Sequence, residues 1–265
     1  MNEAIVKTPL DLRNQDSGKI DSNEGIYEKN EGYFNLLAYI FSNAVSGEIM
    51  AVENYSEMVM LMSDTEGKIE AVKQSYDESK HIRMLSNLGK RFSLDVMQEI
   101  IEPQWFNIRR YFSSAVQKKD LISCLIIQDL LTEGMAIVLY RILQRDTDSE
   151  TAVTARKILE DEEEHLNLGL NRIRRFVSAS PEEAHESLSW SHYRVMPELF
   201  SMVSTNCHFL CDRLGLDCSS LSLSNLKTDI NSVRLEALEL HMEILDRAGF
   251  DPKITAPLIA KMQSY

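Results

Sequence analysis

Residues 121–140 read LISCLIIQDLLTEGMAIVLY, and this stretch decides the fold. Its length and hydrophobicity match those of a membrane-spanning helix. However, Gln128, Asp129 and Glu133 lie within the run, and acidic side chains near the centre of a bilayer are costly. The stretch therefore predicts a core helix of a protein that is not integral to a membrane, and its acidic residues need an explanation.

Helical periodicity extends from this run in both directions, and no segment alternates with period two for long enough to predict a strand. Ser93 is expected to cap a helix with Pro103 near its middle, and Pro197 to kink another. The pattern predicts an all-α bundle, with helices over residues 34–62, 69–88, from 93 past 103, 120–144, 149–177, from 181 past 197, 224–248 and after 252.

Composition narrows the class of protein further. The chain has 265 residues, with only 10 Gly and 6 Pro, which favours long helices joined by few loops. Its 41 acidic and 28 basic residues give a net charge of −13, so nucleic acid is not an expected partner. Four cysteines are too few for a disulfide framework, and a reducing, cytoplasmic location is expected.

The first 31 residues differ from the rest of the chain. They contain Asp, Glu, Asn and Lys throughout and lack the apolar run of a signal peptide. We expect residues 1–31 to form a flexible N-terminal arm and residues 32–265 to form a single helical domain.

A Glu-x-x-His motif occurs at residues 78–81 and again at 162–165. Residues three apart project from the same helix face, but so short a motif is weak evidence alone, and a third copy stands at 182–185. The first two copies have context, because Glu48 lies 30 residues before one and Glu133 lies 29 residues before the other. Each of these glutamates interrupts an apolar stripe, and the third copy has no such partner.

The two units form an internal repeat. Glu48 and Glu133 are 85 residues apart, and His81 and His165 are 84 apart. Four buried carboxylates would repel one another unless cations lay between them, and two divalent ions would balance their charge. The pattern matches the di-iron carboxylate bundles and favours two iron ions, with manganese as an alternative, bound by Glu48, Glu78, His81, Glu133, Glu162 and His165.

Other residues on the two stripes have two interpretations. Tyr55 and Tyr140 lie near Glu48 and Glu133 on their helices, so they either contact the metal site or pack in the core. The apolar residues of the stripes either line a substrate cavity or form closed core; they are Phe41, Val45, Val52, Ile126, Leu130 and Ile137.

Longer segments around the motifs resemble one family. Residues 123–137 (SCLIIQDLLTEGMAI) and 161–169 (DEEEHLNLG) are similar to two ligand helices of the aldehyde-deformylating oxygenases, which are ferritin-like di-iron proteins. The match is thinner elsewhere, and Val52 and Glu163 depart from the family pattern. The resemblance implies a ferritin-like bundle with additional C-terminal helices, with the same six side chains as ligands.

The resemblance also implies an activity. An oxygenase of this kind would use O2 to cleave an aliphatic aldehyde into formate and a hydrocarbon one carbon shorter, with electrons from a ferredoxin or another reductase. The changed surroundings of the site leave a first alternative, in which the same centre oxygenates the nitrogen of an amine or hydrazine. A ferritin-like iron carrier is a second alternative, which the helices after residue 177 disfavour.

Overall fold

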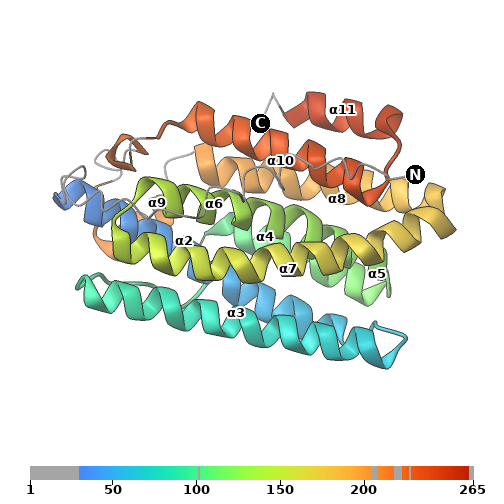
Figure 1. Cartoon of the computed structure of the whole chain (residues 1–265), viewed down its shortest axis with the longest axis horizontal. Helices are drawn as coiled ribbons and strands as arrows, with labels where there is room; N and C mark the ends of the chain where they lie inside the picture. Colours follow the sequence, from blue (N-terminus) through green and yellow to red (C-terminus); the bar gives the residue numbers. More distant parts are fainter. Residues whose placement is uncertain (1–29, 101, 205–207, 218–222, 227, 263–265) are drawn as a thin grey trace, which may run out of the picture.

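The structure, a computed structural model, describes residues 30–100, 102–204, 208–217, 223–226 and 228–262. Within these residues the chain is all helical and contains no strand, as predicted (Figure 1). The elements are α2 (Glu31–Met58), α3 (Thr65–Arg91), α4 (Pro103–Gln117), α5 (Leu121–Leu125), η2 (Ile126–Thr132), α6 (Glu133–Asp146), α7 (Ser149–Ala179), α8 (Pro181–Ser204), α9 (His208–Leu214), η4 (Leu223–Leu226), α10 (Ile230–Ala248) and α11 (Pro252–Met262).

Two helix pairs form the centre of the bundle. α2 packs along α3, α6 packs along α7, and α3 contacts α7 between the pairs. α8, α10 and α11 lie on the side of the bundle away from α3, where α8 and α10 contact α6, α7 or η2 (Figure 1). This is the predicted ferritin-like bundle with additional C-terminal helices.

The run that decides the fold is one continuous helix formed by α5, η2 and α6. Of the described helices, this one alone is long and apolar enough to cross a membrane, and 83% of its apolar window is buried inside the protein. It begins at Asp120, whose carboxylate accepts a hydrogen bond from the backbone N–H of Ser123 at 3.0 Å. The prediction of a core helix is confirmed, and the segment η2 within it is a π-helix.

Local chemistry sets the other helix boundaries that matter for the site. Asp148 caps α7 by accepting hydrogen bonds from the backbone N–H groups of Glu150 and Thr151 at 3.1 and 3.3 Å. Gly249 ends α10 with φ of 83°, a left-handed conformation that favours glycine. These caps fix the start of α7, which carries the second Glu-x-x-His motif, and the end of α10, which packs on α7.

The predicted start was wrong for two helices. Ser93 does not cap a helix: it follows the end of α3 with φ of 57°, and the N–H of Leu94 returns to the carbonyl of Gly89 at 2.9 Å. Pro103 starts α4 instead of lying in a helix middle, because a proline in the first turn needs no hydrogen-bond partner for its nitrogen. The helix predicted from residue 224 begins at Ile230, after the short 3-10 turn η4.

The predicted flexible arm at residues 1–31 lies outside the described residues, except for Asn30 and Glu31. Glu31 begins α2, and Asn30 caps that helix, because its side chain accepts a hydrogen bond from the N–H of Tyr33 at 2.9 Å. The division into an arm and one domain stays a prediction.

Candidate metal centre

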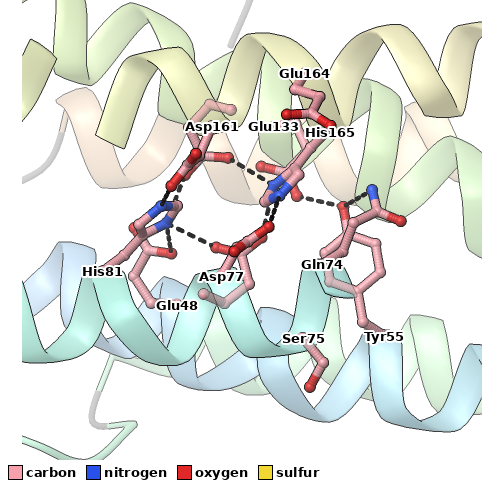
Figure 2. Close-up of polar contacts among 12 residues, drawn as sticks. Glu48, Tyr55, Gln74, Ser75, Asp77, His81, Glu133, Asp161, Glu164 and His165 are labelled. Atoms are coloured by element: carbon pink, nitrogen blue, oxygen red, sulfur yellow. Dashed lines mark hydrogen bonds and ion pairs between the residues drawn. The ribbon is translucent and has the colours of Figure 1, made fainter. Parts of the chain in front are cut away.

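The structure brings the six predicted ligands together in the core. Four helices contribute them, and each residue is at most 5% exposed. They form two overlapping groups whose potential ligand atoms lie within 4.8 Å of one another (Figure 2). The first group is Glu48, Glu78, His81 and Glu162, and the second is Glu78, Glu133, Glu162 and His165.

In both groups the Nδ1 atom of the histidine faces the carboxylates. Nδ1 of His81 lies 3.1 Å from Oε2 of Glu78, 3.4 Å from Oε2 of Glu48 and 3.3 Å from Oε1 of Glu162. Nδ1 of His165 lies 3.1 Å from Oε1 of Glu78 and 3.5 Å from Oε2 of Glu162. Glu78 and Glu162 therefore lie between the histidines, with one oxygen of each toward either group.

Several of these atoms have no hydrogen-bond partner. They are Oε1 of Glu78, both carboxylate oxygens of Glu162, and Nδ1 of His165. The Glu78 and His165 atoms are 3.1 Å apart and still form no hydrogen bond with each other. An unpaired buried polar atom costs about 1–3 kcal/mol. Carboxylate oxygens and an imidazole nitrogen that converge without hydrogen bonds therefore fit a cation bound between them.

Charge supports the same fit. In the described part of the chain, the ion pairs of Glu48, Glu78 and Glu162 are with the two histidines, and none is with Lys or Arg. Burial, followed by the charges of Glu78 and Glu162, raises the pKa of Glu48 well above its ordinary range. Burial and the charges of Glu162 and Glu78 do the same to the pKa of Glu133. Two divalent ions would remove this repulsion.

Behind each histidine lies an aspartate of the other motif, and the one behind His81 is within hydrogen-bond distance. Nε2 of His81 lies 3.1 Å from Oδ2 of Asp161, and Nε2 of His165 lies 3.5 Å from Oδ2 of Asp77. Lys80 lies between the aspartates, with Nζ 2.7 Å from Asp77 and 3.6 Å from Asp161. Partners of this kind orient a ligating imidazole and fix which nitrogen faces the metal.

Sequence reasoning did not assign these aspartates a role, although a signal was present. An aspartate directly precedes the glutamate in both repeated motifs, whereas Pro181 precedes the third copy. That third copy lies outside the cluster: Nε2 of His185 accepts a hydrogen bond from the backbone N–H of Asp251 at 3.3 Å.

The two tyrosines contact the cluster through the glutamate of the opposite helix pair. Tyr55 on α2 donates to Oε1 of Glu133 at 2.7 Å, and Tyr140 on α6 donates a short hydrogen bond to Oε1 of Glu48. Both rings are also buried in the core, so the two interpretations of these residues hold together. A catalytic role for either hydroxyl stays a prediction.

The π-helix η2 supplies one further support that the sequence did not reveal. A π turn closes residue i to residue i+5 and so brings Gln128 and Glu133 onto one face. Nε2 of Gln128 donates to Oε1 of Glu133 at 2.8 Å, and Oε1 of Gln128 accepts from Asn54 at 2.7 Å. Oε1 of Glu133 is thus fixed by two donors, Gln128 and Tyr55.

An apolar cavity of about 280 Å³ opens beside the cluster. Glu48, Glu133 and Glu162 are among its lining residues, and the wall is otherwise mainly apolar, with side chains from α2, α6, α8 and α10. The stripe residues considered from the sequence, Phe41, Val45, Val52, Ile126, Leu130 and Ile137, are not among its lining residues. The wall comes from a neighbouring face of the same helices and includes Leu36, Ile40, Ala44, Ala136, Leu139 and Leu143.

Fold and cluster together define a ferritin-like bundle with a carboxylate and histidine site suited to two metal ions. The sequence profile of the family described as "Long-chain fatty aldehyde decarbonylase" matches residues 30–210, and the chain belongs to this family. Among solved structures, the fold is similar to that of "Protein 19 with aldehyde deformylating oxidase activity from Synechococcus". That match has a TM-score of 0.69 and 17% sequence identity, and it covers 88% of this chain and 98% of the other.

Proposed function

We propose that this protein is an O2-dependent di-iron oxygenase that cleaves an aliphatic aldehyde into formate and a hydrocarbon one carbon shorter. The observation that carries the proposal is the mainly apolar cavity whose lining includes Glu48 and Glu133 of the cluster. Family membership supports an oxidative enzyme, and the cavity supports a substrate with an alkyl chain.

The six side chains of the cluster would hold the metals. Two iron ions bound there would supply electrons and Lewis acidity for the reduction of O2. Glu78 and Glu162 would serve both ions, because both belong to both groups. The donor set of carboxylate oxygens and imidazole nitrogens, without a thiolate, suits iron or manganese.

The cavity would bind the substrate chain and exclude water. Leu36 and Glu48 both line it and are 12 residues apart on α2, which corresponds to about 18 Å along the helix. A medium-to-long alkyl chain fits such a length, and each buried methylene would contribute about 0.8 kcal/mol. The aldehyde end would then lie at the carboxylates, where the metals would be.

Trp105 shapes the cavity next to the cluster. Its indole N–H donates to Oδ1 of Asn43 at 2.6 Å, which fixes the ring. A Cβ atom at Gly47 would lie 3.1 Å from that ring, so the glycine lets the indole pack beside the residue that precedes Glu48. We infer that Trp105 helps to position the reactive end of the chain.

The reaction needs an electron donor. Aldehyde and O2 become alkane, formate and water only if four electrons and three protons are added, and the side chains of the cluster cannot supply the electrons. We therefore propose that a ferredoxin or another reductase is a partner of this protein.

The test starts from protein loaded anaerobically with Fe²⁺ and supplied with O2, a ferredoxin system and a series of aliphatic aldehydes. Formate and the shortened alkane are expected in equal amounts from wild type, and neither from Glu133→Ala. His185→Ala is the matched control and should retain the activity. An N-oxygenated product from an alkyl amine or hydrazine, without formate from any aldehyde, would favour the first alternative, and many iron ions per chain without product would favour an iron carrier.

A further inference from the structure

The outer face of α3 carries exposed apolar residues with a basic residue at each end. Ile69, Val72 and Tyr76 are 57%, 56% and 59% exposed, and their spacing places them on one face of the helix. Lys68 and Arg83 lie on the same face, are exposed, and form no ion pair within the described residues. We call these five residues the α3 stripe. Exposed apolar residues that cluster in this way mark a contact site, unlike apolar residues that are exposed singly.

The charge of this segment contrasts with that of the whole chain. The protein has a net charge of −13, whereas residues 68–83 contain four Lys or Arg and three acidic residues. Two of the acids, Asp77 and Glu78, are buried, and the third, Glu70, is paired with Arg172. The two unpaired basic residues of the stripe therefore fit a partner that carries acidic side chains around an apolar contact.

The α3 stripe lies beside the histidine side of the metal centre. Nζ of Lys80 is 5.7 Å from the centre of the Tyr76 ring and 3.6 Å from Oδ2 of Asp161. That oxygen lies 3.1 Å from Nε2 of His81, whose Nδ1 faces the candidate ligands (Figure 2). The Asp161 side chain is itself 33% exposed, so one residue separates solvent from the His81 ring. Tyr76 and His81 are five residues apart on α3, about 7.5 Å along the helix axis.

The apolar cavity does not border α3. Its lining residues come from α2, α4, η2, α6, α8, η4 and α10, and α7 contributes Glu162. In Figure 1, α3 forms the edge of the bundle away from α8, α10 and α11. The α3 stripe is thus close to the candidate ligands but separate from the cavity that would hold the substrate.

We propose that the α3 stripe is the docking surface for the protein that donates electrons to the metal centre, a one-electron carrier with acidic residues around an apolar contact. This rests on the proposed function, because it requires an external electron donor. In each encounter the carrier would be oxidised by one electron and one ferric ion reduced to ferrous, and no bond forms or breaks. Four such transfers supply the four electrons that the reaction needs.

Two other occupants fit the stripe less well. A second copy of the chain would present the same basic residues, so a contact between two α3 stripes would offer no opposite charge to Lys68 and Arg83. A membrane on this face would lie on a side of the bundle that does not border the cavity, so an apolar substrate could not pass from it directly to the metals. The donor protein is the occupant for which both the charge and the position are suited.

The test titrates an acidic plant-type [2Fe–2S] ferredoxin into the iron-loaded, full-length protein. The double variant Lys68→Glu with Arg83→Glu reverses both charges, and Val72→Ser removes an apolar contact. Each should bind ferredoxin at least about tenfold more weakly than wild type, and wild-type binding should weaken as the ionic strength rises. Lys253→Glu and Leu235→Ser are the matched controls, because they change exposed residues on α11 and α10, and they should bind as wild type does.

Reduction of the bound iron separates docking from the chemistry of the centre. With ferredoxin below saturation, the ferric ions of both stripe variants should be reduced at least about tenfold more slowly than those of wild type. Dithionite with methyl viologen needs no protein contact, so it should reduce all the proteins at the same rate. Elemental analysis should give the same iron content for the variants as for wild type.

Several results would overturn the inference. One is ferredoxin binding and reduction in both stripe variants at wild-type levels. Another is an equal slowing with dithionite, because the stripe would then act on the metal centre itself. A third is unchanged ferredoxin binding with a loss of self-association, or of binding to vesicles of anionic phospholipid, which would assign the stripe to a second copy or to a membrane. By contrast, variant-dependent reduction by ferredoxin without formate from any aldehyde would contradict the proposed function and leave the docking surface in place.

Discussion

The two helix pairs provide equivalent ligands but support them differently. In α6 and α7, Oε1 of Glu133 accepts hydrogen bonds from Tyr55 and Gln128. In α2 and α3, Oε1 of Glu48 accepts from Tyr140. Both helix pairs, which are the two halves of the site, have an amide side chain five residues before the glutamate. Asn43, however, accepts from the indole N–H of Trp105 and does not contact Glu48.

The helix geometry explains this difference. Asn43 and Glu48 lie in the regular α-helix α2, where residues five apart do not share a face. Gln128 and Glu133 are joined across a π turn, which brings the amide to the carboxylate. The amide five residues before the glutamate therefore contacts the carboxylate of Glu133 but not that of Glu48, because the helix before Glu133 has the wider turns of a π-helix.

The largest effects should come from the ligands that both groups share. Glu162→Ala removes a carboxylate from both groups and should lower the iron content from about two ions per chain to almost none. Glu48→Ala affects one group and should leave about one ion. Elemental analysis after anaerobic loading measures both, with Glu182→Ala as the control. Equal losses in the two variants would show that the two groups do not bind separate ions.

The histidines test the repeat itself. His81→Ala and His165→Ala should each reduce the iron content by about one ion, because each histidine belongs to one group. His185→Ala should reduce it by none, since His185 binds the N–H of Asp251 at the surface. Losses of the same size in all three variants would contradict the assignment of the repeat.

Much of this arrangement could be predicted from the sequence because buried charge is rare. An acid inside an apolar stripe, as at Glu48 and Glu133, is informative because burial without compensation is costly. The match of the two spacings then identified the four helices, and the structure brings all six side chains together. Their role as ligands stays a prediction.

What could not be predicted depends on packing. α2 and α6 are buried on more than one face, so the periodicity that identified Phe41 and Ile137 as apolar could not tell which face borders the cavity. The π-helix η2 leaves no sequence pattern as distinct as a proline or a cap. Asp129 was visible in the sequence as a buried acid, but its contact with Tyr55 exists only in the folded protein.

The metal-free protein should respond to pH through the unshared glutamates. A carboxyl group whose pKa is raised by folding binds its proton more tightly in the folded state. The contribution of these two groups to the free energy of unfolding should therefore fall as the pH rises above the ordinary value of 4.5, by about 1.4 kcal/mol for each unit of pKa shift. Loaded protein should not show this decline, because the ions compensate the charges.

Substitution of each unshared glutamate measures how much each half of the site contributes to this pH dependence. Glu48→Gln and Glu133→Gln should each reduce the decline in urea unfolding experiments on metal-free protein, and Glu48→Gln should reduce it more. Glu133 already has two donors that stabilise its charged form, whereas Glu48 has the Tyr140 hydroxyl. The exposed Glu182→Gln should have no effect. Glu48→Gln and Glu133→Gln variants with the same pH dependence as metal-free wild type would contradict the raised pKa values.

The smallest effects should come from the two tyrosine hydroxyls, and they test the comparison most directly. Tyr140→Phe removes the donor to Oε1 of Glu48, and a hydrogen bond to a charged group contributes about 1.5–3 kcal/mol, so iron affinity in that half should fall by about tenfold or more. Tyr55→Phe should cost less, because Gln128 still donates to Glu133. Tyr33→Phe, which removes a buried hydroxyl far from the cluster, should lower stability but not iron affinity. If Tyr55→Phe proved the more damaging of the two, the amide that the π-helix brings to Glu133 would not compensate for the phenol, and the link from Tyr55 to Asp129 would be the more important support of that half.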